Sequence, residues 1–223
     1  MDAVSRWLFP EGIYRVLASV RRNLKRRLSF LKRRFAHPPY PVDTGKKVLL
    51  HIGCGKINSP EFINIDAQPY AHVHVVTDDI GRLPGFADET ADLIYMCHVL
   101  EHIRAPDVDA VLREMKRILK VGGILRLSVP DFDRLLDVYK AAGEDLDAIH
   151  TQLMGGQDSQ YNVHYCAFNH RSLSELLRKV GFAAVRPWDP GNCRHHDFKD
   201  KACKVLTVGD QSFTISLNLE AVK

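Results

Sequence analysis

From residue 46 onward, the hydrophobic positions switch between a strand-like and a helix-like period. Short apolar runs predict five strands, near residues 47–52, 62–66, 73–77, 92–97 and 124–129. Residues 105–120 carry apolar side chains at steps of three or four, which predicts a helix, and Gly122-Gly123 is expected to close it. This alternation predicts an α/β fold with a doubly wound, mostly parallel sheet.

The last third of the chain continues this alternation and ends in strands. The polar, aromatic stretch 155–170 is expected to be a loop, and Ser172 with Glu175 predicts a capping box for the helix that follows. Two apolar runs on either side of Gly209-Asp210 predict a hairpin. The expected elements are helices over 131–142, 144–154 and 172–180 and strands over 183–189, 204–208 and 212–222.

Residues 1–45 differ from the rest in pattern. Apolar residues recur at steps of three or four along 11–35, which predicts an amphipathic helix, and the Pro-rich segment 37–41 is expected to end it and to act as a linker. The apolar stripe consists of Ile13, Leu17, Val20, Leu24, Leu28, Leu31 and Phe35. We therefore divide the chain into an N-terminal arm, residues 1–45, and a domain, residues 46–223.

The charges divide in the same way. Residues 1–40 hold ten Lys and Arg against two acidic residues, a net charge of +8, while the rest holds twenty-one against twenty-five, a net charge of −4. A mildly acidic domain argues against nucleic acid as a partner. The basic arm fits an anionic membrane surface; packing on the domain, docking on a protein partner and an organelle transit peptide are the alternatives.

Cysteine usage and hydropathy bear on the compartment. The five cysteines are scattered and odd in number, which indicates reduced thiols. No apolar run is long enough to span a membrane, and no signal-peptide pattern follows the N-terminus. We therefore expect a cytoplasmic protein, with the arm allowing a peripheral position at the inner face of a membrane.

The stretch from Val48 to Asp66 carries the first candidate chemistry. An apolar run breaks at Gly53-Cys54-Gly55, and glycines at this point let the backbone approach a bulky ligand. Asp66, at the end of the next run, is placed to accept hydrogen bonds from a ribose diol. A dinucleotide fingerprint needs a third glycine where this chain has Asn58, so the pattern favours a nucleoside cofactor other than NAD.

Six segments, LLHIGCGK, FINID, DDIGRLPGFADETADLIYMCHVLEHI, LREMKRILKVGGILRLSVPD, LLRKVGF and ISLNLEAVK, resemble class I S-adenosylmethionine-dependent methyltransferases. The resemblance is to the small ones found among bacterial surface-polysaccharide genes. It implies a Rossmann-like sheet of seven strands that ends in an antiparallel hairpin strand, and S-adenosylmethionine as the cofactor. Because only six residues separate Gly55 from Phe62, the usual first helix must be reduced to about a turn.

The resemblance also implies roles for residues at the carboxyl edge of the sheet. The segment Gly53-Cys54-Gly55 would pass the methionine and ribose portion of the cofactor, and Asp66 would hold the ribose hydroxyls. Asp79 would bond the adenine amino group, with Ile80 packed on the ring and His98 in the pocket. From the sequence pattern alone, Asp79 is also a plausible turn residue.

A hydroxyl acceptor must lose its proton during methyl transfer, because its pKa lies far above neutrality. His98, Glu101 and His102 follow the fourth strand and would share one face of a helix. We expect His102 or His164 to act as the base, with Glu101 in the same catalytic group.

The same segment looks like the Glu-x-x-Glu-His motif of ubiquinone-pathway and small-RNA O-methyltransferases, in which those side chains bind a divalent metal. Here His98 replaces the first Glu, so a metal at His98, Glu101 and His102 is one alternative. Helix capping and pocket lining by Glu101 and His102 is the other. A further group, Cys193, His195, His196 and Cys203, matches no paired zinc-ligand spacing, so we expect a solvated loop there.

These patterns predict methyl transfer from S-adenosylmethionine to a hydroxyl of a glycan or glycolipid precursor, the acceptor resting on the family resemblance alone. A non-catalytic cofactor-binding or scaffold module that acts through its arm is the alternative. A nucleotide-dependent oxidoreductase is disfavoured by Asn58 and by the terminal hairpin.

Overall fold

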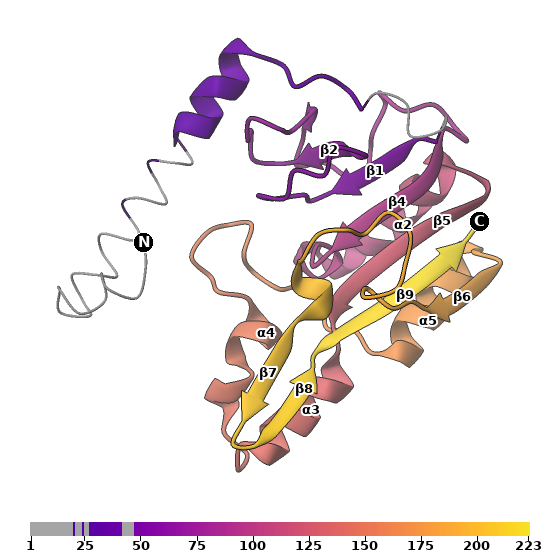
Figure 1. The fold of residues 1–223 in the computed structure, drawn as a ribbon. Helices are drawn as coiled ribbons and strands as arrows, with labels where there is room; N and C mark the ends of the chain where they lie inside the picture. The colour runs from indigo at the N-terminus through magenta and orange to yellow at the C-terminus, as the bar shows by residue number, and fades with distance from the viewer. Residues whose placement is uncertain (1–19, 21–23, 25–26, 42–46) are drawn as a thin grey trace.

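The structure is a computed structural model that describes residues 20, 24, 27–41 and 47–223. Its strands in the main sheet are β1 (Leu49–Ile52), β2 (Ile63–Asp66), β3 (Val75–Val76), β4 (Ala91–Cys97), β5 (Leu119–Pro130), β6 (Ala184–Pro187) and β9 (Ser216–Val222). They form one seven-stranded sheet in the order β3-β2-β1-β4-β5-β9-β6 (Figure 1). All are parallel apart from β9, which is antiparallel to both β5 and β6. The predicted fold class is confirmed.

One face of the sheet is covered by two of the helices, α2 and α5. The α-helices of the domain are α2 (Val108–Ile118), α3 (Phe132–Ala141), α4 (His150–Met154) and α5 (His170–Val180). Leucine side chains of α2 and α5, such as Leu112 and Leu177, are fully buried in one cluster with Ile52 and Ile94 of the central strands. Both helices repeat apolar residues at helical spacing, so their buried stripes dock on the alternating apolar side of the strands.

The opposite face of the sheet is covered by irregular chain. The segment 188–204 passes across the front of the sheet in the view of Figure 1. It buries Trp188 and Ala202 against Leu49 and Tyr95, which alternate along β1 and β4 with the residues that face the helices. The first connection, from Gly55 to Phe62, contains turns and no helix, as expected from its length.

Beyond the sheet edge, a hairpin packs with α3. The strands β7 (Val205–Val208) and β8 (Gln211–Thr214) pair antiparallel as a separate two-stranded sheet. The sequence predicted one run over 212–222, but the chain breaks at Ile215, whose N–H donates to Lys204 O. Because Ile215 is fully buried with Leu135 and Val138 of α3, the chain leaves the hairpin there and enters the main sheet as β9.

Two predicted helix signals were wrong. Gly122 and Gly123 do not close α2, which ends at Ile118 because the chain turns directly into β5; Gly122 N–H instead donates to the carbonyl of Lys223. The N-cap of α5 is Asn169, which forms a reciprocal capping box with Ser172, rather than Ser172 with Glu175. An Asn side chain caps as well as Ser, so the N-cap lies three residues earlier than expected.

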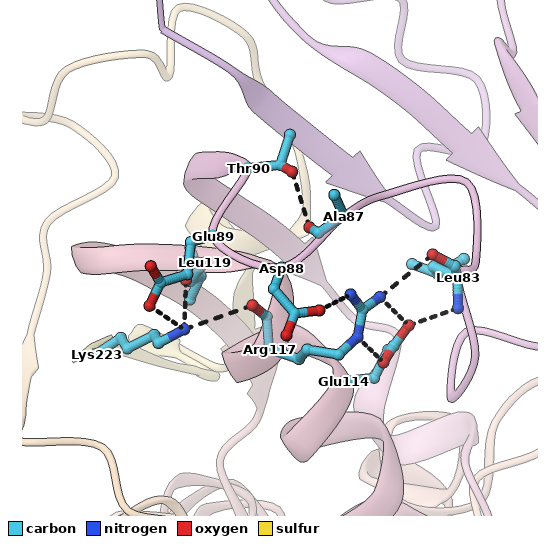
Figure 2. Close-up of polar contacts among 9 residues, drawn as sticks. All are labelled: Leu83, Ala87, Asp88, Glu89, Thr90, Glu114, Arg117, Leu119 and Lys223. Carbon is cyan, nitrogen blue, oxygen red and sulfur yellow. Dashed lines mark hydrogen bonds and ion pairs between the residues drawn. The ribbon is translucent and has the colours of Figure 1, made fainter.

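An ion-pair network on α2 holds the connection from β3 to β4. Arg117 bonds Asp88 at 2.6 Å and Glu114 at 2.8 Å, and the Glu114 carboxylate accepts a bond from Leu83 N–H at 2.6 Å (Figure 2). Near the C-terminus, Lys223 Nζ donates to Leu119 O at 2.7 Å. These contacts fix residues 83–90 on α2. Because these residues belong to the connection from β3 to β4, the start of that connection is held at the carboxyl edge of the sheet.

Candidate cofactor and active site

β1 ends in a turn that requires glycine. Gly53 has φ +67°, and a Cβ there would lie 2.3 Å from Val99 Cγ2. The N–H groups of Gly53 and Cys54 both donate to Ile65 O, at 2.8 and 3.2 Å, which closes the turn against β2. Main chain therefore forms this wall of the site without an intervening side chain.

Asp66 lies beside that turn, at the end of β2. Its Oδ2 accepts a hydrogen bond from Gly55 N–H at 2.7 Å, and its Oδ1 accepts one from Gln68 N–H at 2.8 Å. The two backbone donors hold the carboxylate in one orientation, and each oxygen keeps a further lone pair. Asp66 can therefore accept hydrogen bonds from a ribose diol.

Two adjoining cavities open at this edge of the sheet. The first has a volume of about 250 Å³, and its walls include Gly53, Asp66, Ile80, His98, His102 and Tyr161. The second, of about 460 Å³, shares Asp78, Ile80, His102 and Ile103 with the first. Together they form one cleft in the range of roughly 300–1,000 Å³ that is usual for small-molecule sites.

The structure places the predicted cofactor residues unevenly in this cleft. Of these residues, the first cavity is lined by Gly53, Asp66, Ile80 and His98. Asp79 lines only the second cavity. Asp78 lines both cavities. Cys54 packs under the turn with Tyr70 and Val73, and burial raises the pKa of its thiol. Gly55 takes part through its N–H to Asp66, not through either cavity wall.

Some cleft residues were missed in the sequence. Asp78 precedes Asp79, and nothing in the doubled Asp indicated which of the two would face the ligand. Gln160 and Tyr161 reach the cavity from the loop 155–170. The sequence predicted a polar, aromatic loop. Because this loop is far in sequence from the strands that end at the cleft, its place beside them could not be predicted. Gly155 closes it: a Cβ there would lie 2.4 Å from Asn162 O.

A buried group of titratable side chains adjoins the cleft. His98 precedes the short turn η2 (Leu100–His102) with φ +53°, so the expected helix face does not form. The hydroxyl of Ser216 donates to Lys201 O at 2.7 Å, and it therefore accepts from His98 Nε2 at 2.9 Å. The other ring nitrogen, Nδ1, lies 3.1 Å from Glu101 Oε1, an attractive contact when a proton lies between them.

His164 Nε2 lies 4.0 Å from Glu101 Oε1, and the His102 ring lies beside both groups. His102 Nδ1 donates to Val163 O and His164 Nδ1 donates to Gln152 O, both at 3.0 Å. A neutral imidazole that donates from Nδ1 carries its lone pair on Nε2. The two ring centroids lie 4.7 Å apart, and burial lowers the pKa of His164. Both histidines are thus set up as acceptors of a proton or as ligands.

Glu101 lies at the centre of this group. It is fully buried, and neither carboxylate oxygen accepts a hydrogen bond of normal geometry from the described residues. Burial opposes ionisation of Glu101, but the adjacent His98 imidazole outweighs it and lowers the pKa of this carboxyl group. Ligand atoms of Glu101, His102 and His164 all lie within 4.8 Å of one another. His164 takes the place that the sequence gave to His98, whose Nε2 is engaged by Ser216.

The other candidate cluster, around residues 193–203, is divided between two separate contacts. His196 is almost fully buried and lies 3.3 Å from Asp200 Oδ2, which also accepts from the hydroxyl of Tyr95. His195 contacts Glu61 instead, at 2.9 Å. In the part of the chain that the structure describes, no three side chains of His, Cys, Asp or Glu come close enough together there to hold a metal ion. The expected solvated loop is wrong for His196, because the segment packs on the sheet.

Comparisons with known proteins bear on the fold and on the class of protein. A family described as a methyltransferase domain matches residues 57–127, less than half of the chain. No curated protein matches the sequence. A solved S-adenosylmethionine-dependent methyltransferase of Archaeoglobus fulgidus has 17% identity and a TM-score of 0.51, covering 89% of this chain and 94% of its own. Another solved protein, of Thermotoga maritima, is titled a possible histamine N-methyltransferase. It has 20% identity and a TM-score of 0.49, covering 93% of this chain and 96% of its own.

At such identities the likeness to the Archaeoglobus protein concerns the fold. The matched methyltransferase segment, this fold and the cleft at the carboxyl edge support an S-adenosylmethionine-dependent methyltransferase, with S-adenosylmethionine as the cofactor. The residues fit that group, since the glycine turn leaves main chain at the wall and Asp66 offers oriented acceptors.

Proposed function

We propose that the protein transfers a methyl group to a hydroxyl, on a glycan or glycolipid precursor, with His102 as the base. When bound, S-adenosylmethionine supplies an electrophilic methyl group on its sulfonium. The chain must then orient the acceptor and take up its proton. The observation that carries the proposal is the position of His102, which lines both cavities. Its Nδ1 donates to Val163 O, and among the described residues its Nε2 makes no hydrogen bond.

His164 and Glu101 support the same role. A proton taken up at His102 Nε2 would lie near the buried Glu101 carboxylate, which stabilises an imidazolium. His164 offers a second unprotonated Nε2 and is the alternative base. The glycan or glycolipid identity of the acceptor is supported only by the resemblance of the sequence motifs to methyltransferases of surface-polysaccharide genes.

The base is tested with His102→Ala and His164→Ala on an acceptor found by screening glycans and glycolipids. We expect the loss of the base to lower the rate of methyl transfer by on the order of a hundred- to ten-thousand-fold, with cofactor affinity little changed. His150→Ala is the matched control, because His150 is exposed at the start of α4. Wild-type rates in both His102→Ala and His164→Ala would place the base elsewhere.

A metal-assisted reaction is a second candidate, favoured by the buried Glu101 oxygens, which accept no hydrogen bond of normal geometry from the described residues. Two imidazoles whose Nδ1–H groups are fixed by backbone carbonyls, together with a buried carboxylate, make a donor set for Zn²⁺, Mn²⁺ or Fe²⁺. In that case a chelator should reproduce the loss seen in the variants, and added Zn²⁺ or Mn²⁺ should restore activity. Unchanged activity after chelation leaves only the direct base.

The cofactor residues are tested by calorimetry with S-adenosylmethionine and NAD. Asp66→Ala should weaken S-adenosylmethionine binding by about tenfold or more, because it removes charge-assisted acceptors. Of the neighbouring pair, Asp78→Ala should weaken it more than Asp79→Ala, since only Asp78 lines both cavities. Equal affinity of Asp66→Ala and the wild type, or a preference for NAD, would contradict the assignment.

A glycolipid acceptor would lie at a membrane, and we propose that the basic arm brings the protein to the inner face of one. None of the helices in the described part of the chain is long and apolar enough to cross a bilayer. The rival function, a scaffold that acts through its arm, predicts cofactor binding without turnover of any acceptor. The same acceptor screen therefore separates the two.

A further inference from the structure

The described part of the arm is docked on the domain by one face of its helix, over residues 27–35. Arg33 donates from Nε to Val73 O at 2.7 Å and from Nη2 to His74 O at 3.0 Å. Ser29 Oγ accepts from Ala71 N–H at 2.9 Å. On the same side, Phe30 packs edge-on against Tyr70, with ring centroids 5.4 Å apart. These contacts fix how the helix is rotated about its own axis.

The predicted apolar stripe is not part of this contact. Its described members are exposed, with Leu28 at 51%, Leu31 at 52% and Phe35 at 80%. With about 100° per residue, the middle of the stripe lies on the side of the helix roughly opposite to Arg33. Packing of the stripe on the domain, one of the alternatives from the sequence, is therefore wrong for these residues. The domain holds the helix by the opposite side and leaves the stripe exposed, with Leu31 and Phe35 lining a groove beside the domain.

Basic side chains flank the stripe on both sides. Lys32 lies about 80° from the midline of the stripe in one direction, and Arg27 and Arg34 lie about 60–80° from it in the other. All three are exposed. A stripe with cations along both margins complements a surface that is apolar below a layer of negative charge. Two such faces from two copies of this chain would bring like charges together.

Aromatic residues extend the surface at its end. Phe35 and Tyr40, which is 58% exposed, line a groove of about 970 Å³ between the arm and the β2–β3 edge, together with Leu31. Aromatic side chains of this kind favour the boundary between water and lipid headgroups. The exposed apolar area thus continues from the helix into the groove.

We propose that this face of the arm, defined by Leu28, Leu31 and Phe35 with Arg27, Lys32 and Arg34, binds the surface of an anionic lipid bilayer. The apolar side chains enter the boundary between headgroups and acyl chains, and the cations meet lipid phosphates. Arg33, Ser29 and Phe30 act as a clamp that sets the domain in one orientation above the bilayer. The inference rests on the proposed peripheral position, but not on the identity of the acceptor.

The test is co-sedimentation of the full chain with vesicles of phosphatidylglycerol and phosphatidylcholine at low salt. We expect binding to vesicles that contain phosphatidylglycerol, weaker binding to pure phosphatidylcholine, and loss of binding as salt rises. The double variant Leu31→Glu/Phe35→Glu should lower the partition coefficient by at least about tenfold, because it removes apolar contact and adds negative charge.

The matched control is Val121→Glu/Leu146→Glu, which makes the same change at two exposed apolar residues of the domain, 79% and 63% exposed. It should bind vesicles within about twofold of the wild type. Calorimetry with S-adenosylmethionine shows that both variants are folded, and it separates a failure of this surface from a failure of the proposed function.

Three outcomes would overturn the proposal. The first is a wild-type chain that ignores phosphatidylglycerol vesicles at low salt. The second is equal loss of binding in the arm variant and its control. The third is a wild-type dimer that Leu31→Glu/Phe35→Glu converts to a monomer in sedimentation, which would assign the face to a second copy of the chain.

Discussion

The two faces of the central sheet are built from different kinds of sequence. The face under α2 and α5 is a continuous apolar cluster, in which Leu112 and Leu177 interlock with the alternate residues of the strands. The face under 188–204 combines aromatic rings with titratable groups, among them His51 and Asp200, which are buried or nearly so. Stability on the first face depends on packing, and on the second also on hydrogen bonds and protonation.

This difference decides how each face should respond to substitution. Removing apolar volume from a close-packed cluster costs the transfer free energy and leaves a cavity. Removing one polar partner in a buried network leaves the other without compensation. The helical face should therefore be sensitive to truncation of side chains, and the irregular face to loss of single polar atoms and to pH.

The largest effect is expected on the helical face. Leu112→Ala removes a fully buried side chain of α2 and should lower the free energy of unfolding by about 2–5 kcal/mol. Urea denaturation followed by circular dichroism measures it. Leu136→Ala on α3 is the control, because Leu136 is 36% exposed and should cost much less. Similar losses in the two variants would mean that the helical face is not close-packed.

A smaller effect is expected from the polar network of the other face. Tyr95→Phe removes the hydroxyl that donates to Asp200, and a hydrogen bond to a charged group contributes about 1.5–3 kcal/mol. The free energy of unfolding should fall by that order, although ring packing is kept. Tyr165→Phe, at a tyrosine that is 53% exposed, should change it little. If Tyr95→Phe is neutral, the network is not a source of stability.

The same comparison shows how much of the fold the sequence could predict. Helical periodicity identified α2 and α5, since burial on one side of a helix leaves a repeat in the sequence. The segment 188–204 has no repeat, so nothing local indicated that His196 would be buried. Its burial depends on Tyr95, 101 positions away along the chain, as well as on the nearby Asp200.

Prediction of the site shows the same limit. The sequence could place Gly53 and Asp66 at the cleft because the end of a strand fixes the local backbone geometry. The pairing of His102 with His164 depends on a loop that is pinned to η2 by Tyr165 N–H to Glu101 O, at 2.8 Å. No spacing rule encodes that contact, although the residue types were singled out.

The smallest effect, and the one specific to the irregular face, is a dependence of stability on pH through His51. Burial lowers the pKa of His51 to about 3, with Asp200 opposing the shift and His196 and His72 adding to it. Nδ1 has no hydrogen-bond partner among the described residues, and the ring stacks on Phe198. The folded protein therefore holds His51 neutral, whereas the unfolded chain takes up a proton near pH 6.5.

Because the unfolded state binds the proton more tightly, this contribution to stability is present above about pH 6.5 and is lost as pH falls toward 3. Between pH 7.5 and 5.5 the wild type should lose roughly 1 kcal/mol more of its free energy of unfolding than His51→Leu, which cannot titrate. Urea denaturation of both proteins across this range measures the difference. On the helical face, Leu112→Ala should shift the whole curve without changing its slope. Parallel curves for the wild type and His51→Leu would show that the irregular face is held by packing alone, like the face under α2 and α5.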